Sequence, residues 1–140
     1  MQIFPFSNIV VGILIFIVGF IFHWVGQIVS IINWDFSIKI GIHEKSMLPE
    51  YKVYEHAMAV ADVTIGWIYC FASIGLTFNF SWGNTLAWFP GVLLIYHSIG
   101  YWFWIGNQNK VGNSTTSKKF RVIWFLLNFI TGVLCIIEAL

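Results

Sequence analysis

The hydrophobic positions of this chain fall into four long apolar stretches, which three polar stretches separate. The apolar stretches cover residues 9–32, 55–78, 85–105 and 120–140. Each has at least the roughly 20 residues that a helix needs to cross a hydrocarbon core of about 30 Å. The polar stretches between them are short, so consecutive helices are expected to lie antiparallel as neighbours. The pattern therefore predicts an all-α integral membrane protein, with residues 1–140 forming one domain of four transmembrane helices in an up-down antiparallel bundle.

Composition supports a surface that faces lipid. Hydrophobic residues make up 59% of the chain and charged residues only 9%, whereas soluble domains carry roughly 25% charged residues. The lipid bilayer is therefore the first expected partner. The formal net charge is +1, and the sequence has no basic patch with interleaved aromatic residues, which argues against nucleic-acid binding.

The basic residues are distributed unevenly between the two sides of the predicted bundle. All seven lie in or beside the first and third polar stretches, namely Lys39, Lys45, Lys52, Lys110, Lys118, Lys119 and Arg121. Loops rich in Lys and Arg usually stay on the cytoplasmic side of a membrane. This rule predicts that loops 33–54 and 106–119 are cytoplasmic and that both termini lie outside.

Each predicted helix also carries one face of polar or small residues at helical spacing. Such a face should pack against protein, because lipid tails cannot satisfy polar groups. We expect Gly12 and Gly19 to allow close helix packing. The polar members of these faces that we single out as candidate ligand- or proton-binding residues are His23, Gln27, Glu55, Asp62, His97, Tyr101, Arg121 and Asn128.

Four of these candidates lie at a similar predicted depth. His23, Asp62, His97 and Asn128 are roughly five to ten residues from the cytoplasmic end of their helices, at about 1.5 Å per residue. Asp62 is the most informative of them, since an acid inside a membrane helix is costly and commonly marks a functional site. Gln27, Glu55, Tyr101 and Arg121 would lie nearer the cytoplasmic mouth. The sequence thus predicts a polar pocket in the cytoplasmic half of the bundle.

The chemistry of this pocket has several alternatives. A carboxylate beside two histidines can relay protons or act as a general acid and base. His23, His97 and Asp62 are weak candidates for a metal site, and the two histidines could also ligate a haem from both sides. The same side chains could equally serve only as hydrogen bonds between helices, which are worth about 0.6 kcal/mol on average. His43, Glu44 and Glu50 in the first loop are expected to be solvated or to contact headgroups, whereas His56 stands beside Glu55, which continues the face of Asp62.

Three functions therefore stay open. The first is a pocket that binds or transports a small molecule, proton or ion, with Asp62 as its charged anchor, in a homo-oligomer. The second is a membrane enzyme acting on a lipid-soluble substrate. The third is an accessory subunit of a larger membrane complex. We favour the first two over the third and rank binding or transport just ahead of an enzyme. No motif in the sequence names the ligand or a reaction.

Overall fold

The computed structural model describes residues 4–112, 114 and 116–140 of the chain. It is 81% helical, and the described residues contain no strand. The first helix is continuous from Ser7 to Ile32, and consists of α1 (Ser7–Leu14), a π-helical segment η1 (Ile15–Val25) and α2 (Gly26–Ile32). It is followed by α3 (Trp34–Lys39), α4 (Pro49–Ile65), α5 (Trp67–Thr77), α6 (Gly83–Lys110) and α7 (Lys118–Ala139). The all-helical prediction is confirmed.

Two of these helices are long and apolar enough to cross a membrane, Ser7–Ile32 and Lys118–Ala139. The bent pair α4 and α5 adds a third candidate if it is counted as one span. The prediction of a membrane protein is thus supported by two or three candidate spans, and the prediction of four is not confirmed. The predicted span at residues 85–105 lies within α6. This helix is long enough to cross a membrane, but its mean hydropathy is too low to count as a candidate span. Its hydropathy is low because Trp, Tyr, Gly and His97 interrupt its aliphatic residues.

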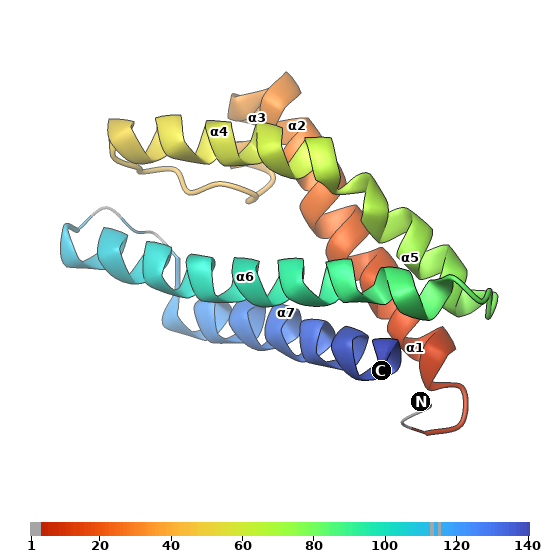
Figure 1. Cartoon of the computed structure of the whole chain (residues 1–140). Coiled ribbons are helices and arrows are strands. Elements are labelled where there is room, and N and C mark those ends of the chain that lie inside the picture. Colours follow the sequence, from red (N-terminus) through yellow and green to blue (C-terminus); the bar gives the residue numbers. More distant parts are fainter. Residues whose placement is uncertain (1–3, 113, 115) are drawn as a thin grey trace.

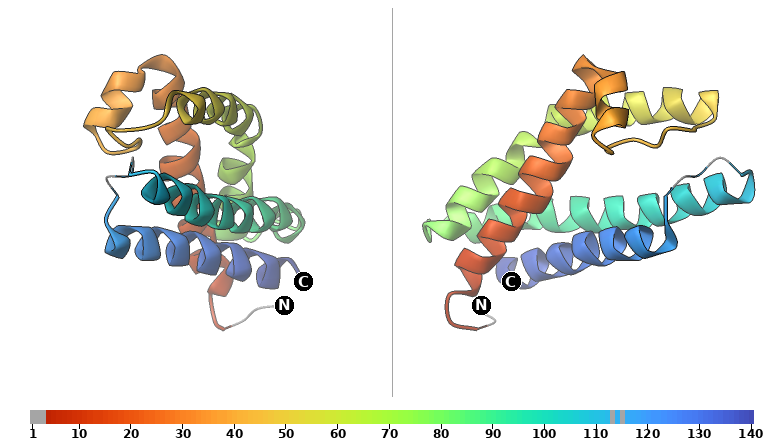
Figure 2. Two further views of the ribbon diagram at one scale, coloured as in Figure 1. Left: turned by 90° about the vertical axis from the view of Figure 1, so that its left-hand side faces the viewer. Right: turned by 180° about the vertical axis from the view of Figure 1, so that it is seen from behind.

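The helices form two pairs that cross each other, rather than a bundle of near-parallel helices (Figures 1 and 2). One pair consists of the first helix and α5, and the other consists of α6 and α7. Helices α6 and α7 run side by side in opposite directions. The first helix crosses this pair steeply, and α5 packs back along α1 and η1. On the other side of the bend from α5, α4 extends over α6 with the two backbones apart, so that only side chains such as Asp62 and His97 meet between them (Figure 1). The molecule is open between these two helices.

The bend between α4 and α5 has a clear cause at Gly66. The two helices differ in direction by 41°, and the indole nitrogen of Trp24 donates a hydrogen bond of 2.9 Å to the carbonyl of Val63. A side chain that inserts into a helical hydrogen-bond ladder is a recognised cause of kinks. A Cβ atom at Gly66 would lie 2.5 Å from Trp24 Cδ1, so the close approach of the indole requires glycine at this position.

The apolar core lies where the two pairs cross. It is built from buried side chains of the first helix, α5, α6 and α7, which are Val11, Ile15, Val18, Tyr69, Ala72, Leu76, Ala87, Leu94 and Cys135. The predicted packing role of two glycines is confirmed, because added Cβ atoms at Gly12 and Gly19 would collide with Thr77 and Tyr69. This crossing region holds the helices together, and the cavity lies beyond it.

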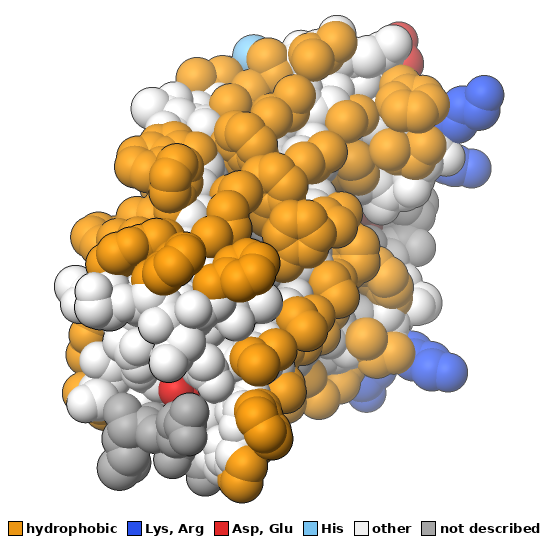
Figure 3. Space-filling model, turned by 90° about the vertical axis from the view of Figure 1, so that its right-hand side faces the viewer, with side chains coloured by type: hydrophobic (Ala, Val, Ile, Leu, Met, Phe, Trp, Pro, Cys, Tyr) orange, Lys and Arg blue, Asp and Glu red, His pale blue; other side chains and the backbone are white. Residues whose placement is uncertain are grey.

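Large hydrophobic side chains also cover much of the outer surface (Figure 3). Only 22% of the most apolar stretch of α7 is buried inside the protein. Such an extent of exposed apolar surface is unusual for a soluble monomer and is typical of a surface that lipid covers.

Candidate functional site

Four polar residues from four different helices meet beyond the core. Asp62 of α4 lies with its Oδ1 atom 3.4 Å from Nε2 of His97 on α6. His23 of η1 lies with its Nε2 atom 2.6 Å from Oδ1 of Asn128 on α7. The rings of His23 and His97 stack with their centroids 4.7 Å apart. The four residues that sequence analysis placed at one depth therefore form a continuous polar layer, Asp62–His97–His23–Asn128.

The hydrogen bonds of Asn128 indicate which ring nitrogen of His23 carries a hydrogen. The amide nitrogen of Asn128 donates to the carbonyl of Trp124 over 2.8 Å, so its Oδ1 atom is the group that faces His23. Since a carbonyl oxygen only accepts, His23 carries a hydrogen on Nε2. Asn128 is fully buried and His23 is 8% exposed. This end of the layer is consequently held rigid from α7.

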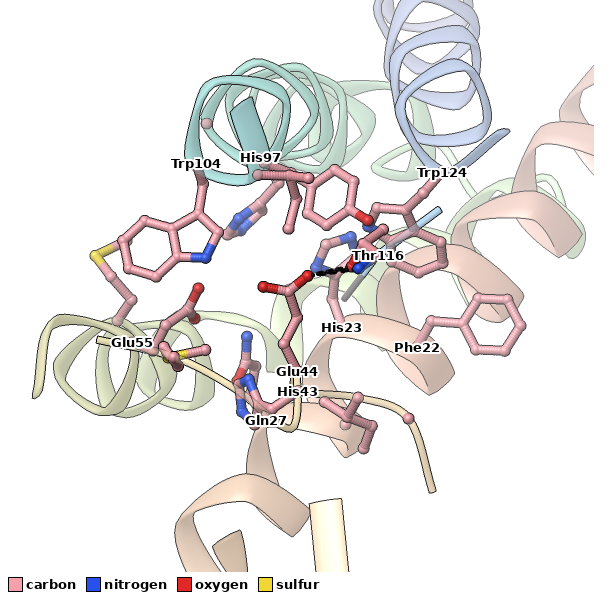
Figure 4. Close-up of a pocket in the computed structure, with 18 of the residues that line it drawn as sticks. Phe22, His23, Gln27, His43, Glu44, Glu55, His97, Trp104, Thr116 and Trp124 are labelled. Atoms are coloured by element: carbon pink, nitrogen blue, oxygen red, sulfur yellow. Dashed lines mark hydrogen bonds between the residues drawn. The ribbon is translucent and has the colours of Figure 1, made fainter. Parts of the chain in front are cut away.

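A large cavity opens on the other side of the layer. It has a volume of about 1630 Å³ and lies between the first helix, α4, the segment after α3 and α6 (Figure 4). Six of the predicted candidates line it, and these are His23, Gln27, Glu55, Asp62, His97 and Tyr101. Most of the remaining wall is aliphatic and aromatic, with Phe22, Val25, Met58, Phe103, Trp104 and Trp124 among its members. The arrangement is thus a few polar groups at the inner end of an apolar cavity.

Two of these lining residues extend the polar layer along α2 and α4. Gln27 donates from Nε2 to Oδ2 of Asp62 at 3.4 Å, while its Oε1 atom is buried without a hydrogen-bond partner. Glu55 lies two helical turns before Asp62, and its side chain projects into the cavity beside Trp104 of α6 (Figure 4). Among the described residues, nothing donates a hydrogen bond to Glu55.

Two predicted candidates lie outside the cavity wall. Asn128 supports His23 from behind. Arg121, which we had expected at the mouth, packs against α6 instead: its guanidinium lies 4.0 Å from the centre of the Trp102 ring and donates to the Trp102 carbonyl. The face of Trp102 thus binds this cation in place of the groups at the cavity mouth. The contact could not be predicted from the spacing of residues along α7, because Trp102 lies on another helix.

Glu44 lies in the first loop, which the sequence pattern assigns to solvent or headgroups, yet it belongs to the cavity wall. The Oε1 atom of Glu44 accepts hydrogen bonds from Ser114 Oγ at 2.6 Å and from the backbone nitrogen of Thr116 at 3.0 Å. Its Oε2 atom accepts from Gln108 Nε2 at 2.9 Å. These bonds tie the segment after α3 to α6 and to the segment before α7, so Glu44 joins the two loops at the edge of the cavity.

His43 lies in the same loop and was missed for the same reason. Its Nε2 atom lies 2.9 Å from Ser30 Oγ, and its ring stacks on Trp34 with the centroids 4.1 Å apart. Burial lowers the pKa of His43 from its ordinary value of 6.5 to about 4. His43 is therefore neutral at physiological pH and anchors the first loop against α2.

The geometry does not support the metal and haem alternatives. Among residues 4–112, 114 and 116–140, no group of three or more His, Cys, Asp and Glu side chains could hold a metal ion. A haem iron held by two histidines would lie between their rings, each pointing a nitrogen at it, whereas His23 and His97 stack face to face at 4.7 Å. The stacked arrangement of these two rings therefore does not favour the alternative of a haem between them.

Comparison of the chain with protein-family models, with curated protein sequences and with solved structures finds no match. The function must therefore be argued from the site.

Proposed function

We propose that this chain is a four-span membrane protein whose cavity binds a small, largely apolar molecule by a polar group. The observation that carries the proposal is the cavity of about 1630 Å³ with apolar walls and the layer of Asp62, His97 and His23 at its inner end. Ligand sites are typically apolar concave spaces in which a few placed polar groups fix the orientation. The apolar walls and the size of the cavity favour a molecule over a bare proton or ion.

Helix α6 is the fourth span in this proposal. Its 28 residues correspond to about 42 Å at 1.5 Å per residue, which exceeds the hydrocarbon core. Its low mean hydropathy comes in part from Trp and Tyr, which are favoured at membrane interfaces. The bonds from Glu44 to Ser114 and Thr116 join the two basic loops at one end of the molecule, which supports placing loops 33–54 and 106–119 together in the cytoplasm and both termini outside.

One observation favours an enzyme as a second candidate. The carboxylate of Asp62 lies 3.4 Å from His97, and both face the cavity. A histidine oriented by a carboxylate is a common general acid or base. A lipid-soluble substrate would fit the apolar walls. The two candidates differ in the effect of Asp62→Asn, which would abolish turnover by an enzyme while the apolar walls still bind the substrate.

The proposal is tested by filling the cavity. Gly100 lines it on α6 between His97 and Trp104, and an added Cβ meets no heavy atom within 4 Å. Gly100→Phe should therefore occupy the cavity without displacing a helix, and Gly100→Ala is the matched control. Native mass spectrometry of the detergent-purified proteins should show a bound small molecule in the wild type and in Gly100→Ala, and its loss in Gly100→Phe. A wild-type protein without bound molecule, or equal occupancy in all three proteins, would contradict the proposal.

A further inference from the structure

The charged groups that line the cavity are mostly carboxylates. Glu44, Glu50, Glu55 and Asp62 face it, and Lys45 is the one Lys or Arg among the described lining residues. Glu44 already accepts hydrogen bonds from Gln108, Ser114 and Thr116, the last through both its backbone nitrogen and its hydroxyl. Glu50 lies exposed at the start of α4. Glu55 and Asp62 are therefore the two carboxylates that a ligand deep in the cavity would meet.

The inner end of the cavity has more hydrogen-bond acceptors than donors. Among the described residues, only His97 and Gln27 contact the carboxylate of Asp62, both at 3.4 Å. This distance is long for a hydrogen bond, whose usual length is near 2.9 Å. The Oε1 atom of Gln27 is buried and has no hydrogen-bond partner in the part of the chain that the structure describes. No described residue donates to the carboxylate of Glu55. A ligand that brings N–H donors would satisfy all three groups, whereas one that brings another acceptor would not.

Aromatic rings flank the same position. The Trp104 ring lies 4.3 Å from that of Tyr51 and 5.6 Å from that of Tyr54, measured between centroids. All three line the cavity, and Trp104 lies beside Glu55 (Figure 4). The faces of Trp and Tyr attract cations, and more strongly where water is excluded. The aromatic group thus favours the same sign of ligand charge as the carboxylates.

The apolar part of the cavity wall indicates what the uncharged part of the ligand should be. Phe22, Val25 and Met58 offer only apolar surface, and about 1630 Å³ is far more than a bare ion or a small polar amine would fill. Burial of each CH₂ group of a ligand here strengthens binding by a factor of about four. A long alkyl or aryl group attached to the charged head would use this surface.

We propose that the cavity binds a lipophilic amine in its protonated form, with the ammonium N–H groups facing Glu55, Asp62 and Gln27 Oε1 and the apolar tail along the wall of the first helix and α6. This assignment rests on the proposed function, since it names the class of ligand for the same cavity.

The test compares three ligands with the same C10 chain: decylamine, 1-decanol and decanoate. Each is titrated by calorimetry into the full chain in nanodiscs of neutral phosphatidylcholine, and titration into empty nanodiscs subtracts partitioning into lipid. Decylamine should bind roughly tenfold more tightly than decanol, because a hydrogen bond to a charged group strengthens binding by about tenfold or more. Decanoate should bind most weakly.

Variants then assign the effect to the cavity. Glu55→Gln should weaken decylamine about tenfold and leave decanol unchanged within about twofold. Asp35→Asn removes an exposed carboxylate on α3 that does not line the cavity, so it should leave all three ligands unchanged. Gly100→Phe should abolish binding of every ligand.

The outcomes separate the two proposals. Equal binding of the three ligands, abolished by Gly100→Phe, would overturn the amine assignment and leave the cavity as a binding site. The same loss of decylamine affinity in Asp35→Asn as in Glu55→Gln would also overturn it, because surface charge alone would then explain the preference. No binding above empty nanodiscs by the wild type would overturn the proposed function, and the amine assignment with it.

Discussion

The hydrogen bond between His23 and Asn128 allows a quantitative prediction for the polar layer. The bond measures 2.6 Å, Asn128 is fully buried and His23 is 8% exposed. Hydrogen bonds between membrane helices average about 0.6 kcal/mol and reach about 1.7 kcal/mol. Because this bond is short and inaccessible to water, we expect a coupling free energy of about 1 kcal/mol between the two side chains. Asn128→Leu alone should cost about 1–3 kcal/mol, since it leaves the buried His23 nitrogen without a partner.

The assay is a double-mutant cycle. The free energy of unfolding of the wild type, His23→Phe, Asn128→Leu and the double variant is measured by titration with sodium dodecyl sulfate in mixed micelles, followed by circular dichroism. Asn109→Leu, at an exposed position near the end of α6, is the control and should change stability by less than about 0.5 kcal/mol. A coupling free energy below about 0.3 kcal/mol, the level at which independent sites simply add, would refute the assignment of a hydrogen-bonded layer.

Three further predictions concern the packing and the loops. Gly83→Ala should destabilise the protein by more than about 1 kcal/mol, because the new Cβ would lie 2.4 Å from the backbone of Gly75, while Gly100→Ala should be neutral or stabilising; chemical unfolding compares the two. Glu138→Met should raise the melting temperature, since both carboxylate oxygens of this buried residue are without partners and such groups cost about 1–3 kcal/mol each. Stability should fall between pH 6.5 and about 4 as His43 becomes protonated in the unfolded chain but not in the folded one, and His43→Gln should reduce this fall; pH-dependent unfolding checks it.

The polar layer could be predicted because its four residues can be located by two properties of helices, the spacing of residues around the axis and the rise per residue along it. Helical spacing assigns polar residues to one face, and the rise per residue gives their depth. Together they brought His23, Asp62, His97 and Asn128 to one level before the structure was known. The ends of the first and last apolar segments were predicted within two residues of the observed helix ends, since apolar sequence stops where the helix does.

The remaining features depend on contacts that no periodic pattern encodes. Helix α4 begins at Pro49 rather than near residue 55, because proline is well tolerated at the first helical position even though the following residues are polar. The bend at Gly66 depends on the indole of Trp24, 42 positions earlier in the chain. The role of His43 depends on a partner in α2, and that of Glu44 depends on partners in α6 and in the loop after it. Loop residues carry no signal for such partners.

The orientation and openness of the cavity are tested together by a single cysteine at Gly100. The variant Gly100→Cys is made with Cys70 and Cys135, the two free cysteines of the chain, replaced by alanine. A small, membrane-impermeant cationic methanethiosulfonate is applied to either side of oriented vesicles, and the modified fraction is measured by mass spectrometry. We predict rapid modification from the cytoplasmic side and none from outside. Modification only from outside, or none from either side, would contradict a cavity that opens between α4 and α6 toward the basic loops.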